Sequence, residues 1–196
     1  MQAKSSKTTI LDLMRSSSYA PQTAEALIET IPISGNLDHF WKDLLELEEN
    51  GEIIKTRFGT YGLPEKMGLV VGRFQLTSKG FGFVIPDNKG ERPDVFVPPR
   101  ALGGAMNNDR VMARVESSSG GNKPEGEIIR IITHANNKIV GIFHQSGDFG
   151  FVTPDDKRIG QDIYIMKRHF GGAKTNQKVV AEITEWPVER RNAEGK

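Results

Sequence analysis

The chain has 196 residues, 37% of them hydrophobic and 26% charged, and its formal net charge is +1. This composition is ordinary for a globular protein, and so small a net charge argues against a duplex binder that depends on phosphate neutralisation. With no cysteine and no run of roughly 20 apolar residues, disulfides, thiolate metal sites and membrane helices are excluded, and we expect a cytoplasmic protein without a membrane partner.

Two short helices are predicted first. Residues 9–12 fit a capping box that opens a helix with Ile10, Leu13 and Met14 on its apolar side. A second helix is predicted over about residues 23–31, where Pro32 stops it.

The third predicted helix is the clearest, because its apolar residues recur at the spacing of one helix face. Asn36 is the expected N-cap, and Asn50-Gly51 provides the C-cap. The apolar face consists of Leu37, Phe40, Trp41, Leu44 and Leu45. In residues 52–63 the side-chain character then alternates along the chain, with a turn at Gly59, as in a β-hairpin. Three helices followed by a hairpin predict that residues 1–64 form a winged-helix-like domain.

The third helix is acidic, although the corresponding helix of many winged-helix proteins reads DNA. Its only Lys or Arg is Lys42, and its acidic residues are Asp38, Asp43, Glu46, Glu48 and Glu49. Phosphates would repel such a helix, which favours a regulatory or protein-contact module. Lys55 and Arg57 in the hairpin either contact a nucleic-acid backbone or lie on a solvated edge.

The rest of the chain contains an internal repeat with an offset of 68 residues. Residues 79–87 match 147–155, residues 94–97 match 162–165, and Gly-Gly-Ala occurs at both 103–105 and 171–173. So many matches at one offset indicate a duplication. We therefore expect two related domains, over residues 67–133 and 138–196.

Each repeat is predicted to form a five-stranded OB-type barrel, because short β-runs alternate with turn residues. In the first repeat the strands are expected at residues 69–75, 80–85, 94–97, 110–116 and 126–132, with residues 117–122 as a mobile loop before the last one. In the second repeat Glu194-Gly195-Lys196 stands where the fifth strand opens. The second barrel is therefore expected to lack its last strand, as in a piece of a longer protein.

Aromatic residues form the candidate binding surface of the first repeat. The period of two places Phe81 and Phe83 on one strand face, and Phe96 can join them from the next strand. Such a platform stacks nucleic-acid bases, each worth roughly 1–3 kcal/mol. Arg73 and Lys79 are placed to hold phosphates beside it. The alternative, that the three rings fill the barrel core, is weakened because valines already supply inward-facing residues; these are Val84, Val95 and Val97.

The second repeat offers the equivalent set Phe149, Phe151 and Tyr164. Gly147 replaces the lysine of the first repeat, with Asp148 next to it, so weaker binding is expected. Cations in the loops of the second repeat can compensate for the missing lysine, or they can lie on a solvated face. These cations are Lys157, Arg158, Lys167 and Arg168.

No catalytic constellation is visible. The four histidines are dispersed without metal-ligand spacing, and no phosphate-binding loop sequence is present. The pair Asp155-Asp156 is more typical of a turn, where aspartate side chains hydrogen-bond to the backbone, than of a cation site. We therefore expect no catalytic residue, metal or cofactor in this chain.

At the family level, residues 79–84 and 95–97 are similar to the paired RNA-binding motifs of cold-shock domains. A winged helix followed by two such units, with Asp-Asp-Lys-Arg-Ile-Gly-Gln-Asp-Ile at 155–163 and Gly-Gly-Ala-Lys at 171–174, resembles the N-terminal region of bacterial ribonuclease R. The resemblance implies a processive 3′→5′ exoribonuclease whose Mg²⁺-dependent nuclease domain follows Lys196, so this segment alone would be inactive. Lys79, Phe81, Phe83 and Phe96 match the cold-shock surface, whereas Pro98 replaces its usual aromatic or histidine.

Three functions remain open at this point. The first is an accessory region that binds single-stranded RNA and feeds it to the rest of its own chain. The second is a winged-helix DNA-binding regulator with OB-type sensor domains. The third is a protein-docking module whose aromatic faces are covered by a neighbouring domain.

Overall fold

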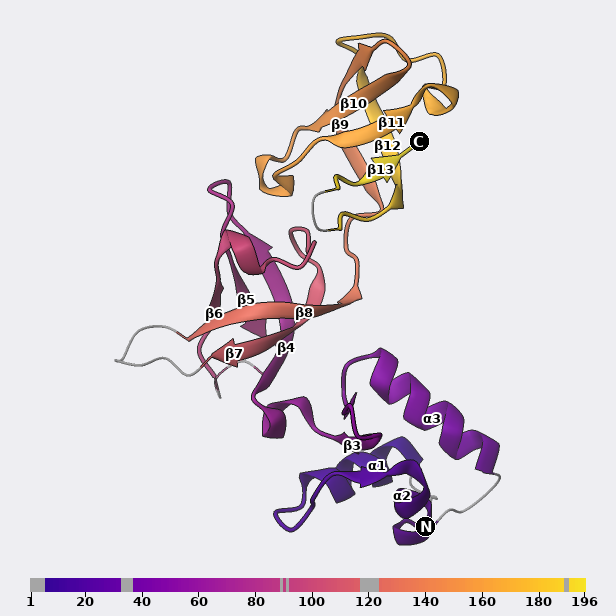
Figure 1. The fold of residues 1–196 in the computed structure, drawn as a ribbon, viewed down its shortest axis with the longest axis vertical. Coiled ribbons are helices and arrows are strands. Elements are labelled where there is room, and N and C mark those ends of the chain that lie inside the picture. The colour runs from indigo at the N-terminus through magenta and orange to yellow at the C-terminus, as the bar shows by residue number, and fades with distance from the viewer. Residues whose placement is uncertain (1–5, 33–36, 89, 91, 117–123, 189–190) are drawn as a thin grey trace. The chain divides into compact units, whose positions relative to one another are not determined.

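The computed structural model describes residues 6–32, 37–88, 90, 92–116, 124–188 and 191–196 (Figure 1). The chain divides into two compact units, Met1–Leu69 and Val70–Lys196. Across the described ranges, no helix combines the length and the apolar character needed to cross a membrane.

The first unit packs three helices against a small sheet, which agrees with the winged-helix prediction. The helices are α1 (Ser6–Arg15), α2 (Ala24–Thr30) and α3 (Leu37–Glu49). The hairpin strands β2 (Ile54–Lys55) and β3 (Thr60–Gly62) pair as predicted, and β1 (Gln22–Thr23) adds a third strand in the order β1-β3-β2. A short 3-10 turn, η1 (Pro64–Met67), follows the sheet.

Two details of the predicted helices are wrong. Helix α1 begins by Ser6, so Thr9 lies inside it and does not open it. The buried face of α3 consists of Phe40, Leu44 and Leu47, which pack with α1 residues in one core cluster. The predicted face residues Leu37, Trp41 and Leu45 are exposed, and the predicted N-cap Asn36 lies outside the described residues.

The second unit contains two closed five-stranded barrels, as the repeat predicted. The first consists of β4 (Leu69–Leu76), β5 (Gly82–Pro86), β6 (Val95–Val97), β7 (Arg110–Glu116) and β8 (Glu125–Thr133), with η2 (Pro99–Ala101) after β6. Its strand order is β4-β5-β6-β8-β7. Val84, Val95 and Val97 lie in its core as expected, beside Phe74. The predicted loop over residues 117–122 lies outside the described residues.

The second barrel repeats this topology. It consists of β9 (Lys138–Ser146), β10 (Phe149–Pro154), β11 (Ile163–Met166), β12 (Lys178–Glu185) and β13 (Glu194–Gly195), with turns η3 (Lys157–Ile159) and η4 (Lys167–His169). Its order, β10-β11-β13-β12-β9, is equivalent to that of the first barrel.

The expectation that the second barrel lacks its fifth strand is wrong. Strand β13 is two residues long, yet it pairs with β11 on one side and with β12 on the other. Lys196 extends this pairing, because its backbone N–H donates to the carbonyl of Glu182 and its carbonyl accepts from the N–H of Glu182. Residues 194–196 therefore close the second barrel, whereas the nine-residue β8 has this role in the first barrel.

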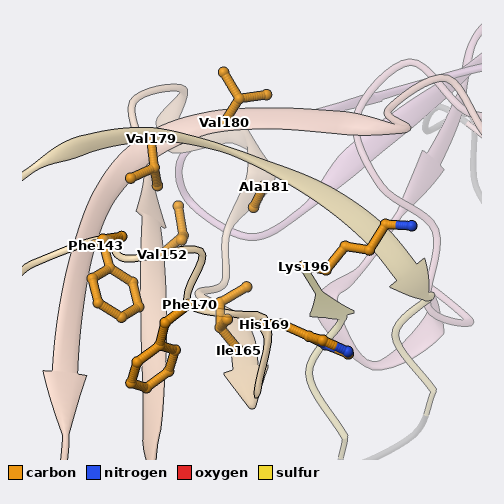
Figure 2. A pocket seen from close by; sticks show the side chains of 10 residues that line it. Phe143, Val152, Ile165, His169, Phe170, Val179, Val180, Ala181 and Lys196 are labelled. Carbon is orange, nitrogen blue, oxygen red and sulfur yellow. The ribbon is translucent and has the colours of Figure 1, made fainter. Parts of the chain in front are cut away.

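The second barrel has a small apolar hollow of about 50 Å³ beside Lys196 (Figure 2). Phe143 and Phe170 lie against each other in it, with ring centroids 4.9 Å apart. In the first barrel, Ile128 and Ile131 of the longer β8 pack against the core cluster.

Candidate nucleic-acid interface

The structure brings the three predicted aromatics of the first barrel together. The ring centroids of Phe81 and Phe83 are 5.9 Å apart, those of Phe81 and Phe96 5.7 Å, and those of Phe83 and Phe96 5.8 Å. Phe83 of β5 is directly opposite Phe96 of β6, so both lie on the same outer face. All three rings are partly exposed. We call this set the first aromatic cluster.

The glycine between the two phenylalanines serves the opposite face of the strand. Gly82 is buried, and a Cβ atom there would lie 2.5 Å from Cζ of Phe74 and 2.6 Å from the carbonyl oxygen of Gln75. The missing side chain gives the fully buried Phe74 room beneath the strand. The Phe-Gly-Phe triplet thus presents two rings outward while accommodating a third ring inside.

Polar groups border the first aromatic cluster. Gln75 of β4 is opposite Phe83, and Glu125 of β8 is beside Phe96. Arg73 is exposed on the same face of β4, and its guanidinium donates to Asn108 at 3.4 Å.

Two further cations lie near this border. Lys79 is exposed in the turn before β5, as the sequence suggested. Arg100 forms an ion pair of 2.6 Å with Glu125. Sequence reasoning missed Gln75 and Arg100; the alternation Arg73-x-Gln75 would have identified the first.

The second barrel assembles the equivalent set Phe149, Phe151 and Tyr164, which we call the second aromatic cluster. Its ring centroids are 5.3 Å apart for Phe149 and Phe151, 5.7 Å for Phe149 and Tyr164, and 6.3 Å for Phe151 and Tyr164. His144 is opposite Phe151, in the position that Gln75 occupies in the first barrel. Gly150 again makes room for a buried ring, here Phe143.

Two of the four loop cations of the second barrel are paired with carboxylates. The ammonium of Lys167 forms an ion pair of 2.6 Å with Asp148. This hydrogen bond lowers the pKa of the Asp148 carboxyl and raises the pKa of Lys167. Arg158 is likewise paired with Asp156, while Arg168 is exposed and its Nε donates to His169. Of the loop cations that could compensate for the missing lysine, Lys167 and Arg158 are therefore already paired with carboxylates.

The two hairpins that carry the clusters differ in length. Phe74 and Phe143 occupy equivalent core positions at an offset of 69, whereas Phe81 and Phe149 are related by the offset of 68. The turn of the second hairpin is therefore one residue shorter, and it contains Gly147, at a φ of +62°, and Asp148. Lys79 has no cationic counterpart in this turn.

No described residues form a group of three or more His, Cys, Asp or Glu side chains that could hold a metal ion. Asp156, one of the two adjacent aspartates, accepts a hydrogen bond from the backbone N–H of Arg158 and caps η3. Asp155 pairs with Lys178 at 2.8 Å. Both carboxylates thus have structural partners in a turn, as the sequence indicated.

Each barrel matches the model of a known protein family. A model of the Ribonuclease B OB domain matches residues 72–131, and a model of the Cold shock domain matches residues 151–196. Two solved structures share the fold: Mycoplasma genitalium RNase R in complex with ribose methylated single-stranded RNA, and yeast Ssd1, a pseudonuclease. The first has a TM-score of 0.57 and 19% identity, over 65% of this chain and 20% of that one. The second has a TM-score of 0.55 and 14% identity, over 67% of this chain and 22% of that one.

Curated proteins align over more of the chain. Ribonuclease R of Thermotoga maritima is 37% identical over 154 residues, 77% of this chain and 21% of its own length. Ribonuclease R of Vibrio parahaemolyticus is 31% identical over 90% of this chain, and that of Escherichia coli 29% over 90%. The chain spans about a fifth of the length of these relatives. By its two barrel domains and by this alignment, the chain belongs to the bacterial ribonuclease R family and corresponds to the N-terminal region of these proteins.

Proposed function

We propose that this chain binds single-stranded RNA through the aromatic clusters of its two barrels and feeds the strand to a 3′→5′ exoribonuclease domain of the same protein. The observation that carries the proposal is the first aromatic cluster, three partly exposed rings within 6 Å of one another on one barrel face. The relatives named ribonuclease R and the RNA-bound solved relative support it.

The chemistry of the face fits an unpaired strand. Aromatic rings stack on bases only when the bases are not already stacked in a duplex, and OB-type barrels commonly bind single strands in this way. Gln75 adds an amide that can donate or accept at a base edge. The cations beside the cluster, Arg73 and Lys79, provide phosphate contacts without creating a strongly positive surface.

Within this proposal the first barrel binds more tightly than the second. Both clusters contain three aromatics, but the turn of the second hairpin has Gly147 where the first has Lys79, with Asp148 next to it. The Asp148–Lys167 ion pair also removes one cation from the surface available to phosphate. A strand held mainly by the first barrel and loosely by the second can slide, as transfer to a nuclease domain requires.

The test is equilibrium binding of a fluorescein-labelled 20-nucleotide oligouridylate, followed by fluorescence anisotropy. The double variant Phe81→Ala/Phe83→Ala removes two stacking partners and should weaken binding by at least about 30-fold, the equivalent of 2 kcal/mol. Phe149→Ala/Phe151→Ala should weaken it less. Circular dichroism of both variants checks that the barrels remain folded.

A matched control separates stacking from general loss of apolar surface. Val140 and Val180 are exposed apolar residues on other strands of the second barrel, and Val140→Ala/Val180→Ala should leave the affinity unchanged. Unchanged affinity in Phe81→Ala/Phe83→Ala would refute the proposal. A DNA-binding regulator predicts tighter, strongly salt-dependent binding to a duplex of the same length, which the same assay measures.

A further inference from the structure

The turn of the hairpin in the first unit carries an exposed aromatic residue. Phe58, between β2 and β3, has 75% of its surface exposed, and no other exposed large hydrophobic side chain in the described part of the chain reaches this value. An apolar ring with so little burial contributes little to the stability of its own domain. Its position at a loop tip is typical of residues that contact a ligand.

A cation already stacks on this ring. The guanidinium carbon of Arg57 lies 4.7 Å from the centroid of Phe58, within the range of a cation–π interaction. The remaining exposure of Phe58 leaves ring surface available to a second planar group. Arg57 and Phe58 together therefore present a flat, positively charged stacking surface.

The turn that carries these two residues is tightly hydrogen-bonded. The backbone N–H of Thr56 donates to the carbonyl of Thr60 at 2.8 Å, and the N–H of Gly59 donates to the carbonyl of Thr56 at 2.9 Å. The hydroxyl of Thr56 lies 2.7 Å from that of Thr60 and accepts from the N–H of Phe58. Gly59 adopts a φ of +76°, which permits so short a turn. The exposed ring is thus held on a well-ordered support, which reduces the entropic cost of binding.

The charges of the hairpin distinguish it from the rest of the first unit. Lys55 lies 5.5 Å from the ring centroid of Tyr61. The pKa of the Glu25 carboxyl is lowered mainly by hydrogen bonds from its own backbone N–H and from Thr23, and the charge of Lys55 adds to this effect. Lys55 and Arg57 are both exposed cations of this hairpin, and Arg57 is the one that lies over the ring of Phe58. By contrast, α3 carries five acidic residues and one lysine.

From this geometry we propose that the hairpin tip, Arg57 and Phe58, is a separate binding site for single-stranded nucleic acid. A base stacks on Phe58 and an adjacent phosphate contacts Arg57. In this arrangement the winged-helix domain contacts nucleic acid by its hairpin, while the acidic α3 does not enter a groove. The site lies in the first unit and does not depend on either barrel.

The experiment uses the complete 196-residue chain and the labelled 20-nucleotide oligouridylate. Phe58→Ala should weaken binding about tenfold, the loss expected for one stacked base. Phe58→Tyr retains the ring and should bind like the unchanged protein, whereas Phe58→Leu retains apolar bulk without a π face and should resemble Phe58→Ala. Leu45→Ala, at an exposed position of α3, is the matched control and should have no effect.

Three outcomes would overturn the inference. Either wild-type affinity in Phe58→Ala or full affinity in Phe58→Leu excludes base stacking, and the second points instead to an apolar protein contact. Photocrosslinking with 4-thiouridine in the oligonucleotide, followed by mass spectrometry, should place crosslinks in the peptide containing Phe58. Crosslinks confined to the barrels would also count against the site. A loss in Phe58→Ala with none in Phe81→Ala/Phe83→Ala would support the hairpin site and refute the barrel proposal.

Discussion

Substitution of Gly82 by alanine should destabilise the first barrel, although only a methyl group is added. The new Cβ would lie 2.5 Å from Cζ of Phe74 and 2.6 Å from the carbonyl oxygen of Gln75. Because Phe74 is fully buried, its ring cannot swing into solvent, and the strand or the ring must shift within the core. Overpacking of this kind costs about 1–3 kcal/mol.

Hydrogen–deuterium exchange of the β5 amides measures this cost locally, since both tryptophans lie outside the first barrel. A loss of about 2 kcal/mol corresponds to roughly thirtyfold faster exchange where exchange requires opening of the barrel. The double variant Gly82→Ala/Phe74→Leu provides the decisive comparison. Leucine is shorter at the point of contact, so the double variant should be more stable than the sum of the single effects by at least about 0.5 kcal/mol. Strict additivity would refute the steric explanation.

Two further predictions concern charged groups. Asp109→Ala should reduce the free energy of unfolding, measured by urea denaturation, by about 3 kcal/mol, because this fully buried carboxylate accepts from the N–H groups of Met106 and Ala135 and contacts Nδ1 of His134 at 3.1 Å. Asp148→Asn should strengthen oligouridylate binding by up to about fivefold, since it releases the ammonium of Lys167 and removes one negative charge. Lys167 lowers the pKa of Asp148 below its ordinary value of 3.8. The ion pair is therefore present at pH 3.8 and above, and it is lost only as the pH falls through the lowered pKa. The gain should therefore be constant from pH 5 to 8 in anisotropy measurements; no gain would show that Lys167 is remote from the strand.

The strand pattern was predictable because alternation and repetition are local properties of the sequence. The offset of 68 indicated two related barrels and the strands of the first one, and the valines beside the aromatics indicated which face is inside. Strand β13 was missed because two residues carry too little pattern to be read as a strand. The tertiary pairing with β11 and β12 defines it.

The buried face of α3 shows why helical periodicity alone was insufficient. Leu37, Trp41 and Leu45 follow a helical spacing, and so do Phe40, Leu44 and Leu47. Both stripes are apolar, and only packing with α1 residues such as Ile10 and Met14 selects the second. Likewise, the Asp148–Lys167 pair joins residues 19 positions apart, which the fold brings together across β10 and β11.

The Phe-Gly-Phe triplet connects the core of the first barrel to its candidate binding face. Along β5 the side chains alternate, so Phe83 faces outward while Gly82 and Val84 face the core. A larger inward residue at position 82 would displace either the ring of Phe74 or the strand itself. A displaced strand would alter the spacing of Phe83 from Phe96, which is set by their direct pairing. The absence of a side chain at Gly82 thus helps to hold the outer rings at a separation suited to stacking, and Gly82→Ala should weaken RNA binding even under conditions in which the barrel remains folded.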